Sequence, residues 1–187
     1  LATSTPALAF KPDGTGHVVI SEAQLKAYSR HVGNRTFHFS DKAVREIIDG
    51  NKYTDAVTGY FLYPPYHFDN EGLTVSSQLL IDQKETVRKK AVAGKGDDAR
   101  LFLGVALHTM QDFYAHSSWV DLGNHALNPA LGRSVLPAPG PGTICPSKEK
   151  AAVVTTGFFN MPNVWYAPPG HCIHGVDHLW AGINKDT

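Results

Sequence analysis

The sequence is poor in cysteine, in net charge and in long apolar runs. Two of its 187 residues are cysteines, and neither lies in a closely spaced thiolate motif. The 17 basic and 17 acidic side chains cancel, which disfavours a non-specific binder of nucleic acid. No apolar run approaches the roughly 20 residues of a membrane span. We therefore expect one domain over residues 1–187, with residues 1–16 as an extended N-terminal arm.

Histidine is the abundant type: ten are present, gathered in motifs. Residues 101–119 place His108, Asp112 and His116 at spacings of four, which puts all three on one stripe of a helix. The helical rise separates the two histidines by roughly 12 Å, so one ion cannot bind both, whereas Asp112 can bridge two ions. Ordinary core histidines are the alternative, but they leave a buried aspartate charge unexplained. The stripe therefore predicts a site for more than one metal ion.

Helical periodicity predicts an all-α fold, a compact helical bundle with long ordered loops. A helix should start at His17, and a second should run from Ser40 as N-cap to a stop at Gly50. A long amphipathic helix should end at Gly94, and Asp97 or Asp98 should cap the central helix. No stretch has a convincing β-pattern.

Two irregular stretches hold further candidate residues. Asp55 and His67 lie in an expected loop, with Tyr63 and Tyr66 between them in sequence. This aromatic loop is either a lid over the core or the lining of a cleft for an amphipathic substrate. Near the C-terminus, a second cluster contains two aromatic and three imidazole side chains: Trp165, Tyr166, His171, His174 and His178.

The two cysteines, Cys145 and Cys172, lie in the irregular second half. A disulfide between them would stabilise the fold by about 3–4 kcal/mol and imply an oxidising compartment. Two buried thiols are the alternative. Residues 1–9 resemble the end of a secretory signal, with a small-residue cleavage pattern at Ala7–Ala9. We expect a secreted or periplasmic protein.

Two segments resemble known families. ALHTMQDFYAHSSWVDLG, followed later by VTTGFFNMPNVWYAPPGHCIHG, is similar to the Het-C heterokaryon-incompatibility family and to N-terminal regions of von Willebrand factor A domain-containing proteins. More distantly, GHVVISEA, Asp55, His67 and the His-x3-Asp helix resemble the trinuclear zinc phospholipases C and the fungal zinc nucleases. This second resemblance implies their all-α fold and two or three zinc ions.

Transferred residue by residue, the resemblance implies three groups of zinc ligands. The first zinc would take Asp55, His67, His108 and Asp112, the second His17 and the bridging Asp112, and the third His116, His174 and His178. The phospholipases complete one site with an N-terminal tryptophan, but no tryptophan precedes His17 here. Their third zinc takes a carboxylate where this chain offers His178 or Asp177.

The resemblance implies a zinc-dependent phosphodiester hydrolase of phospholipase C type acting on phospholipid at a membrane surface. Asp55 would be the general base, and Tyr63, Tyr66, Trp165 and Tyr166 would contact the substrate. One alternative is a single-strand nuclease in which the aromatic rings stack on bases. The other is a non-catalytic Het-C-like cell-death or toxin module with structural zinc. Catalytic zinc sites keep an open coordination position, whereas structural sites are closed.

Overall fold

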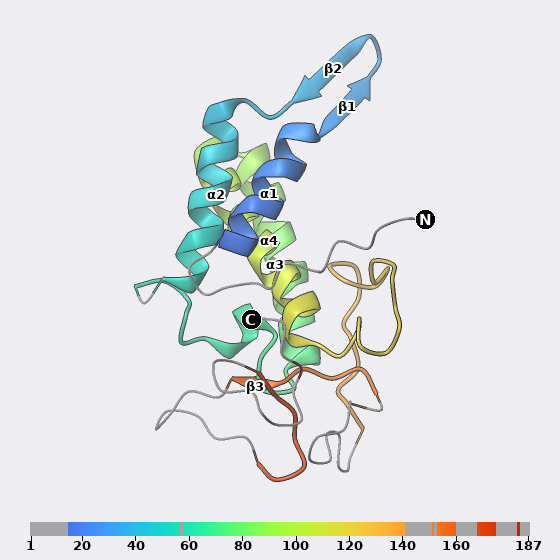
Figure 1. Ribbon diagram of the computed structural model, residues 1–187. Helices are drawn as coiled ribbons and strands as arrows, with labels where there is room; N and C mark the ends of the chain where they lie inside the picture. The colour runs from blue at the N-terminus through green and yellow to red at the C-terminus, as the bar shows by residue number, and fades with distance from the viewer. Residues whose placement is uncertain are drawn as a thin grey trace.

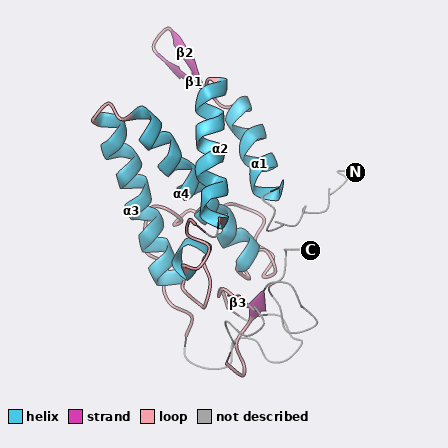
Figure 2. Ribbon diagram, turned by 90° about the vertical axis from the view of Figure 1, so that its left-hand side faces the viewer, coloured by secondary structure: helices cyan, strands magenta, loops and turns pink. Residues whose placement is uncertain are grey.

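The computed structural model describes residues 15–56, 58–140, 151, 153–159, 168–174 and 183. These residues are mostly helical, as expected. The helices are α1 (Thr15–Ala27), α2 (Asp41–Asp55), α3 (Leu73–Val92) and α4 (Gly96–His116), with a short 3-10 helix η1 (Pro64–His67). Helix α4 packs against both α2 and α3, and α1 packs against α2 (Figures 1 and 2). Helix α4 is therefore the central element of the bundle.

Helix α2 begins as expected but ends later. The Ser40 hydroxyl caps it by accepting a hydrogen bond from the Ala43 amide at 3.2 Å. Gly50 is not the stop, because the helix continues to Asp55. A Cβ on Gly50 would lie 2.0 Å from the Leu101 carbonyl oxygen of α4. This glycine is present because the two backbones touch, and the longer helix places Asp55 at a helix end rather than in a loop.

A glycine of α4 marks the same contact from the other side. A Cβ on Gly104 would lie 1.9 Å from the Ile47 carbonyl oxygen and 2.7 Å from the Asn51 nitrogen. The N-cap of α4 is Lys95, which makes no side-chain cap, so the expected cap by Asp97 or Asp98 was wrong. Both aspartates lie in the first turn instead, where negative charge is favourable.

The chain also forms short strands that were not expected. Strands β1 (Ser29–Val32) and β2 (Arg35–His38) make an antiparallel hairpin that projects beyond α1 and α2 (Figure 1). All eight strand residues are exposed, so the hairpin has no buried face and the sequence shows no apolar alternation. Strands β3 (Phe158–Phe159) and β4 (Ile173–His174) pair in parallel.

Two apolar clusters each include residues of α4. One joins α1, α2 and α4 through buried Leu25, Val44, Ile47 and Ile48, with Leu103 and Leu107 packed against them. The other joins the residue that follows η1, helices α3 and α4, and the loop after α4, around Phe68, Leu73, Leu80, Ala106 and Phe113. Both anchor the helix that carries the candidate ligands.

Several sequence predictions concern residues outside the described part: the N-terminal arm up to residue 14, Cys145, Trp165, Tyr166, Asp177 and His178. For His174 only the backbone, in β4, is described. Among the helices of the described residues, none is both long and apolar enough to cross a membrane.

Candidate metal centre

Six of the predicted ligands converge on the C-terminal half of α4. This helix supplies three buried side chains, His108, Asp112 and His116, with exposed fractions of 0%, 1% and 9%. The other three arrive from separate elements: His17 from the first turns of α1, Asp55 from the end of α2 and His67 from the end of η1. In Figure 1 the start of α1 and the end of α2 lie at the same level of the bundle.

The first group of ligand atoms surrounds one oxygen of Asp112. Its Oδ2 atom lies 2.9 Å from His67 Nδ1 and 3.0 Å from His108 Nε2. The Oδ1 atom of Asp55 lies 3.3 Å from His108 Nε2 and 3.9 Å from His67 Nδ1. Zinc bonds of 2.0–2.1 Å in a tetrahedron would put ligand atoms about 3.3 Å apart. The ligand atoms of Asp55, His67 and His108 lie within 4.8 Å of one another and could hold one ion, and Asp112 Oδ2 contacts both of these histidines.

The second group surrounds the other oxygen of Asp112. Its Oδ1 atom lies 3.2 Å from His17 Nε2 and 3.9 Å from His116 Nε2. The His17 and His108 rings, which face different oxygens, stack with centroids 4.1 Å apart. The Asp112 carboxylate thus stands between two sets of nitrogen atoms, as a bridging ligand would.

The other nitrogen of each ring makes a hydrogen bond to a neutral oxygen. Amide and carbonyl oxygens only accept hydrogen bonds, so these outer nitrogens carry the hydrogen and the inner ones can present a lone pair. This is how protein metal sites fix the orientation of their histidines. The four hydrogen bonds are His17 Nδ1 to Gln111 Oε1 (2.9 Å), His67 Nε2 to Tyr60 O (3.2 Å), His108 Nδ1 to Asn51 Oδ1 (3.4 Å) and His116 Nδ1 to His67 O (2.7 Å).

Two buried atoms at the centre lack a hydrogen bond within the described part of the chain: His108 Nε2 and Asp112 Oδ1. Both atoms have an oppositely charged group within 3.3 Å, but none of these contacts has the geometry of a hydrogen bond, and a buried polar atom without one is costly. Both atoms belong to groups whose ligand atoms lie within 4.8 Å of one another and could hold a metal ion. The donor types, their spacing and these two atoms fit a divalent cation.

Without a cation, protons would have to compensate the charges. Burial favours the neutral form of Asp112, yet the rings of His108, His116 and His17 outweigh it and hold the Asp112 pKa well below its ordinary value. Burial also opposes the charging of His108, but the carboxylates of Asp112 and Asp55 raise its pKa to about 9. The charged His108 ring would then stack on the His17 ring with centroids 4.1 Å apart.

Asp55 is the most accessible of the ligands described, since its side chain is 22% exposed against 1% for Asp112. A tyrosine cluster lies beside it in the chain. The Tyr60 ring stacks on Tyr66 at 3.9 Å, and the Tyr63 side chain is 58% exposed. Burial, aided by its tyrosine neighbours, raises the pKa of Tyr66 to about 12, so this phenol stays protonated. The ligand cluster therefore opens towards solvent on the Asp55 side.

The segment after His67 has unusual backbone conformation. Phe68, Asn70 and Glu71 all have left-handed φ angles of 53–59°, which cost non-glycine residues about 1–3 kcal/mol each. Between them, Asp69 Oδ1 lies 3.1 Å from His116 Nδ1. Glu71 Oε1 accepts a hydrogen bond from His171 at 2.6 Å. Sequence reasoning assigned no role to either carboxylate, because nothing local marks such a turn.

The third predicted zinc group is described only in part. His116 faces Asp112 and Asp69, but the side chains of His174 and His178 lie outside the described residues. A zinc ion on those three histidines stays a prediction. Cys172 is buried and disulfide-bonded. The sequence has one other cysteine, Cys145, which is not among the described residues.

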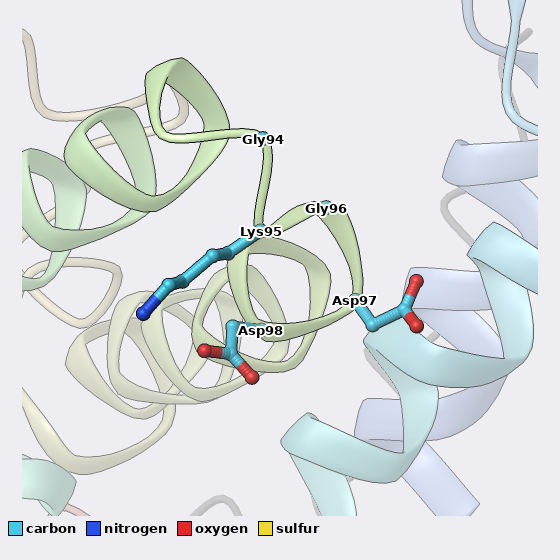
Figure 3. A pocket seen from close by; sticks show the side chains of 5 residues that line it. All are labelled: Gly94, Lys95, Gly96, Asp97 and Asp98. Atoms are coloured by element: carbon cyan, nitrogen blue, oxygen red, sulfur yellow. The ribbon is translucent and has the colours of Figure 1, made fainter.

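A hollow of about 300 Å³ lies at the turn between α3 and α4, lined by residues 94–98 (Figure 3). It is at the opposite end of α4, roughly 20 Å from Asp112 by the helical rise. Its two carboxylates already pair with basic side chains, Asp97 with Lys42 and Arg100 and Asp98 with Lys90. We assign no function to it.

The fold and the site together define a mostly helical domain with a buried histidine and aspartate cluster. The family described as the VWA7 N-terminal domain matches residues 19–140, which are 122 of the 187 residues, and the chain belongs to this family. The matched region contains the cluster residues from Asp55 to His116, whereas His17 precedes it by two positions. No solved structure matches the chain.

The relatives include von Willebrand factor A domain-containing protein 7 of mouse and human. The mouse protein is 33% identical over 168 residues, covering 78% of this chain and 18% of the relative. The human protein is 30% identical over 198 residues, covering 94% of this chain and 21% of the relative. The chain thus spans about a fifth of the length of these relatives.

Proposed function

We propose that the cluster binds two zinc ions bridged by Asp112 and that the protein is a zinc-dependent phosphodiester hydrolase of phospholipase C type. The observation that carries the proposal is the orientation of the four rings. Each donates its outer N–H to a fixed oxygen and turns its inner nitrogen towards a carboxylate of Asp112 or Asp55. The proposal includes kinship with Het-C proteins and with the zinc phospholipase C fold, which the family membership alone does not establish.

Accessibility supports a catalytic rather than a structural site. A structural site has all its coordination positions filled by protein ligands, whereas a catalytic site leaves one position open to water and substrate. Every described ligand of the cluster is buried except Asp55, whose side chain is 22% exposed. Substrate and water would therefore approach from this side.

When bound, a pair of zinc ions supplies Lewis acidity that withdraws charge from phosphoryl oxygens and favours the ionisation of water. The chain's own groups perform the remaining tasks. Asp112 holds the two sets of nitrogens at a fixed separation through its two oxygens. Asp55, at the open side, is placed to accept a proton from an attacking water, which is the role of a general base.

Phospholipid is the substrate that the surroundings favour. The rings of Tyr60, Tyr63 and Tyr66 form a cluster next to the ligand His67, whose Nε2 contacts the Tyr60 carbonyl, and such amphipathic rings suit a substrate that is polar at one end. The net charge is zero, and a polynucleotide would need a basic surface. These features support phospholipid over a single-stranded nucleic acid.

The test uses zinc content and turnover together. We expect protein purified without chelator to contain at least two zinc ions per chain and to release phosphocholine from phosphatidylcholine in mixed micelles. Asp55→Asn should reduce the release at least about a hundredfold. The variant should keep its fold and the zinc ion on the His17 side of Asp112. Asp49→Asn makes the same change at an exposed position of α2 and should leave activity unchanged.

The outcomes separate the alternatives. Two ions without turnover of lipid or nucleic acid would contradict catalysis and favour the structural module. Cleavage of single-stranded DNA with none of phosphatidylcholine would select the nuclease. Protein with no zinc would reject the centre itself.

A further inference from the structure

Behind the ligand rings lies a pair of amide side chains, Asn51 of α2 and Gln111 of α4. Asn51 is 1% exposed. Its position follows from the close contact of the two helices at Gly50 and Gly104, since Gly104 faces the Asn51 backbone. The two amides thus occupy the space where α1, α2 and α4 meet.

The hydrogen bonds of this pair connect both groups of ligands. Gln111 Oε1 accepts from His17 Nδ1 at 2.9 Å and from Asn51 Nδ2 at 3.0 Å. Asn51 Oδ1 accepts from His108 Nδ1 at 3.4 Å. Gln111 Nε2 donates to the Ser21 hydroxyl at 2.9 Å. One network therefore holds the outer nitrogens of His17 and His108.

The chemistry of an amide fixes more than the direction of the rings. An amide oxygen accepts and cannot donate, so each histidine must carry its hydrogen on Nδ1. The Nε2 atom is then left with a lone pair, which faces Asp112 Oδ1 for His17 and Asp112 Oδ2 for His108. Amides also keep the same charge at every ordinary pH, so this selection does not depend on titration.

A neutral acceptor suits this place. A carboxylate behind a ligand histidine is common in metal sites and makes the ring more basic. The centre already contains the carboxylates of Asp55 and Asp112, and Asp69 stands behind His116. A further negative charge behind His17 or His108 would favour protonation of both rings. The amides orient the rings without adding that charge.

We propose that Gln111 and Asn51 are positioning residues that hold His17 and His108 in the Nδ1–H tautomer with Nε2 towards the metal. The Gln111 oxygen accepts from His17 and from Asn51, and Asn51 in turn accepts from His108. The amide pair therefore couples the two ion positions. This inference rests on the proposed dinuclear centre. It goes beyond that centre by naming the residues that select which nitrogen binds.

The test measures the affinity of each ion by competition with a chromophoric chelator. Gln111→Met keeps the volume but removes the acceptor, and we expect the ion at His17 to bind about 10–100-fold more weakly. The ion at His108 should weaken less, because Asn51 remains. Gln111→Glu restores an acceptor oxygen but adds the negative charge that the amide avoids, so it should recover the affinity only in part. Gln78→Met, at an exposed position of α3, is the matched control and should bind both ions like wild type.

A second measurement reads the tautomer directly. In zinc-loaded protein with 15N-labelled histidine, NMR should show both rings bound through Nε2, with their Nδ1 hydrogens protected from exchange. In Gln111→Met the Nδ1 hydrogen of His17 should exchange faster, an effect that a merely structural glutamine would not cause. If Gln111→Met fails to fold, Ser21→Ala, which removes the hydroxyl that accepts from both Gln111 Nε2 and Asn51 Nδ2, must weaken the His17 ion instead.

Failure of the two proposals is distinguishable. Wild-type protein that binds fewer than two ions would reject the dinuclear centre. Wild-type protein with two ions, beside a folded Gln111→Met protein with unchanged affinities and unchanged exchange, would reject the positioning role and leave the centre standing.

Discussion

The two ends of α4 carry the same kinds of side chain in opposite surroundings. At its start, Asp97 and Asp98 are exposed and pair with basic residues such as Lys90. Four turns later, Asp112 is 1% exposed and faces histidine rings. Exposed pairs contribute little because water already solvates both partners. A buried carboxylate must be compensated, by the charged rings or by the proposed ion, so a metal centre is proposed only at the second end.

The largest effect should follow from Asp112→Asn. Asparagine keeps the shape but removes the negative charge shared by both groups of nitrogens, so the affinities for both ions should fall together by more than about a hundredfold. Zinc per chain after dialysis measures this. His116→Ala is the comparison, because it should remove one ion at most. An asparagine variant that keeps two ions would show that Asp112 does not bridge.

Gly104→Ala breaks the packing that creates the buried end. The added Cβ would lie 1.9 Å from the Ile47 carbonyl oxygen, so α2 and α4 would have to move apart, with an expected loss of about 3 kcal/mol in the free energy of unfolding. Chemical denaturation measures the loss. Gly140→Ala is the control, since a Cβ there meets nothing within 4 Å. Equal effects of the two substitutions would show that the glycine contact is not needed.

The pH dependence of stability should differ between metal-free and zinc-loaded protein. In metal-free protein the raised pKa of His108 gives stability that is present below pH 6.5 and lost as pH rises through about 9. The lowered pKa of Asp112 gives stability that is present above pH 3.8 and lost as pH falls through the lowered value. In zinc-loaded protein the ion competes with protons, so stability should rise from pH 5 to 7.

Thermal unfolding across this pH range, with zinc or with chelator, measures both profiles. His125→Ala removes an exposed histidine and should leave the two profiles unchanged. Profiles that coincide with and without zinc would show that the cluster is an ion-pair network and not a metal centre.

The sequence predicted the parts of the site that depend on local periodicity. The stripe of His108, Asp112 and His116 needs only the pitch of one helix, and His17 needs only a helix start. Asn51 was missed because its role depends on the contact between α2 and α4. Gly50 permits this contact, but in the sequence it cannot be distinguished from a glycine that ends a helix. Only the packing of α2 against α4 shows that this glycine lies at a helix contact and not at a helix end.

Resemblance and structure contributed different things to the candidate site. Asp55 and His67 entered through the resemblance alone, since no local pattern links them to α4, and the structure places both beside His108. The hairpin of β1 and β2 could not be predicted, because a ribbon exposed on both faces has no apolar period. Its turn at Gly33, with φ of 56°, is the only local signal within that segment.

The smallest effect should follow from Asp98→Asn, which makes at the exposed end of α4 the change that Asp112→Asn makes at the buried end. Lys90 lies 2.8 Å from Asp98 and holds the Asp98 pKa below its ordinary value. Both groups are largely solvated, so losing the pair should leave the unfolding midpoint and the zinc content within error of wild type. Any residual shift should shrink as salt is added, because surface charges are screened over about 10 Å at 0.1 M. The measurement is thermal unfolding at low and high ionic strength, beside Asp112→Asn. A salt-independent loss as large as that of Asp112→Asn would mean that burial is not what separates the two ends of the helix.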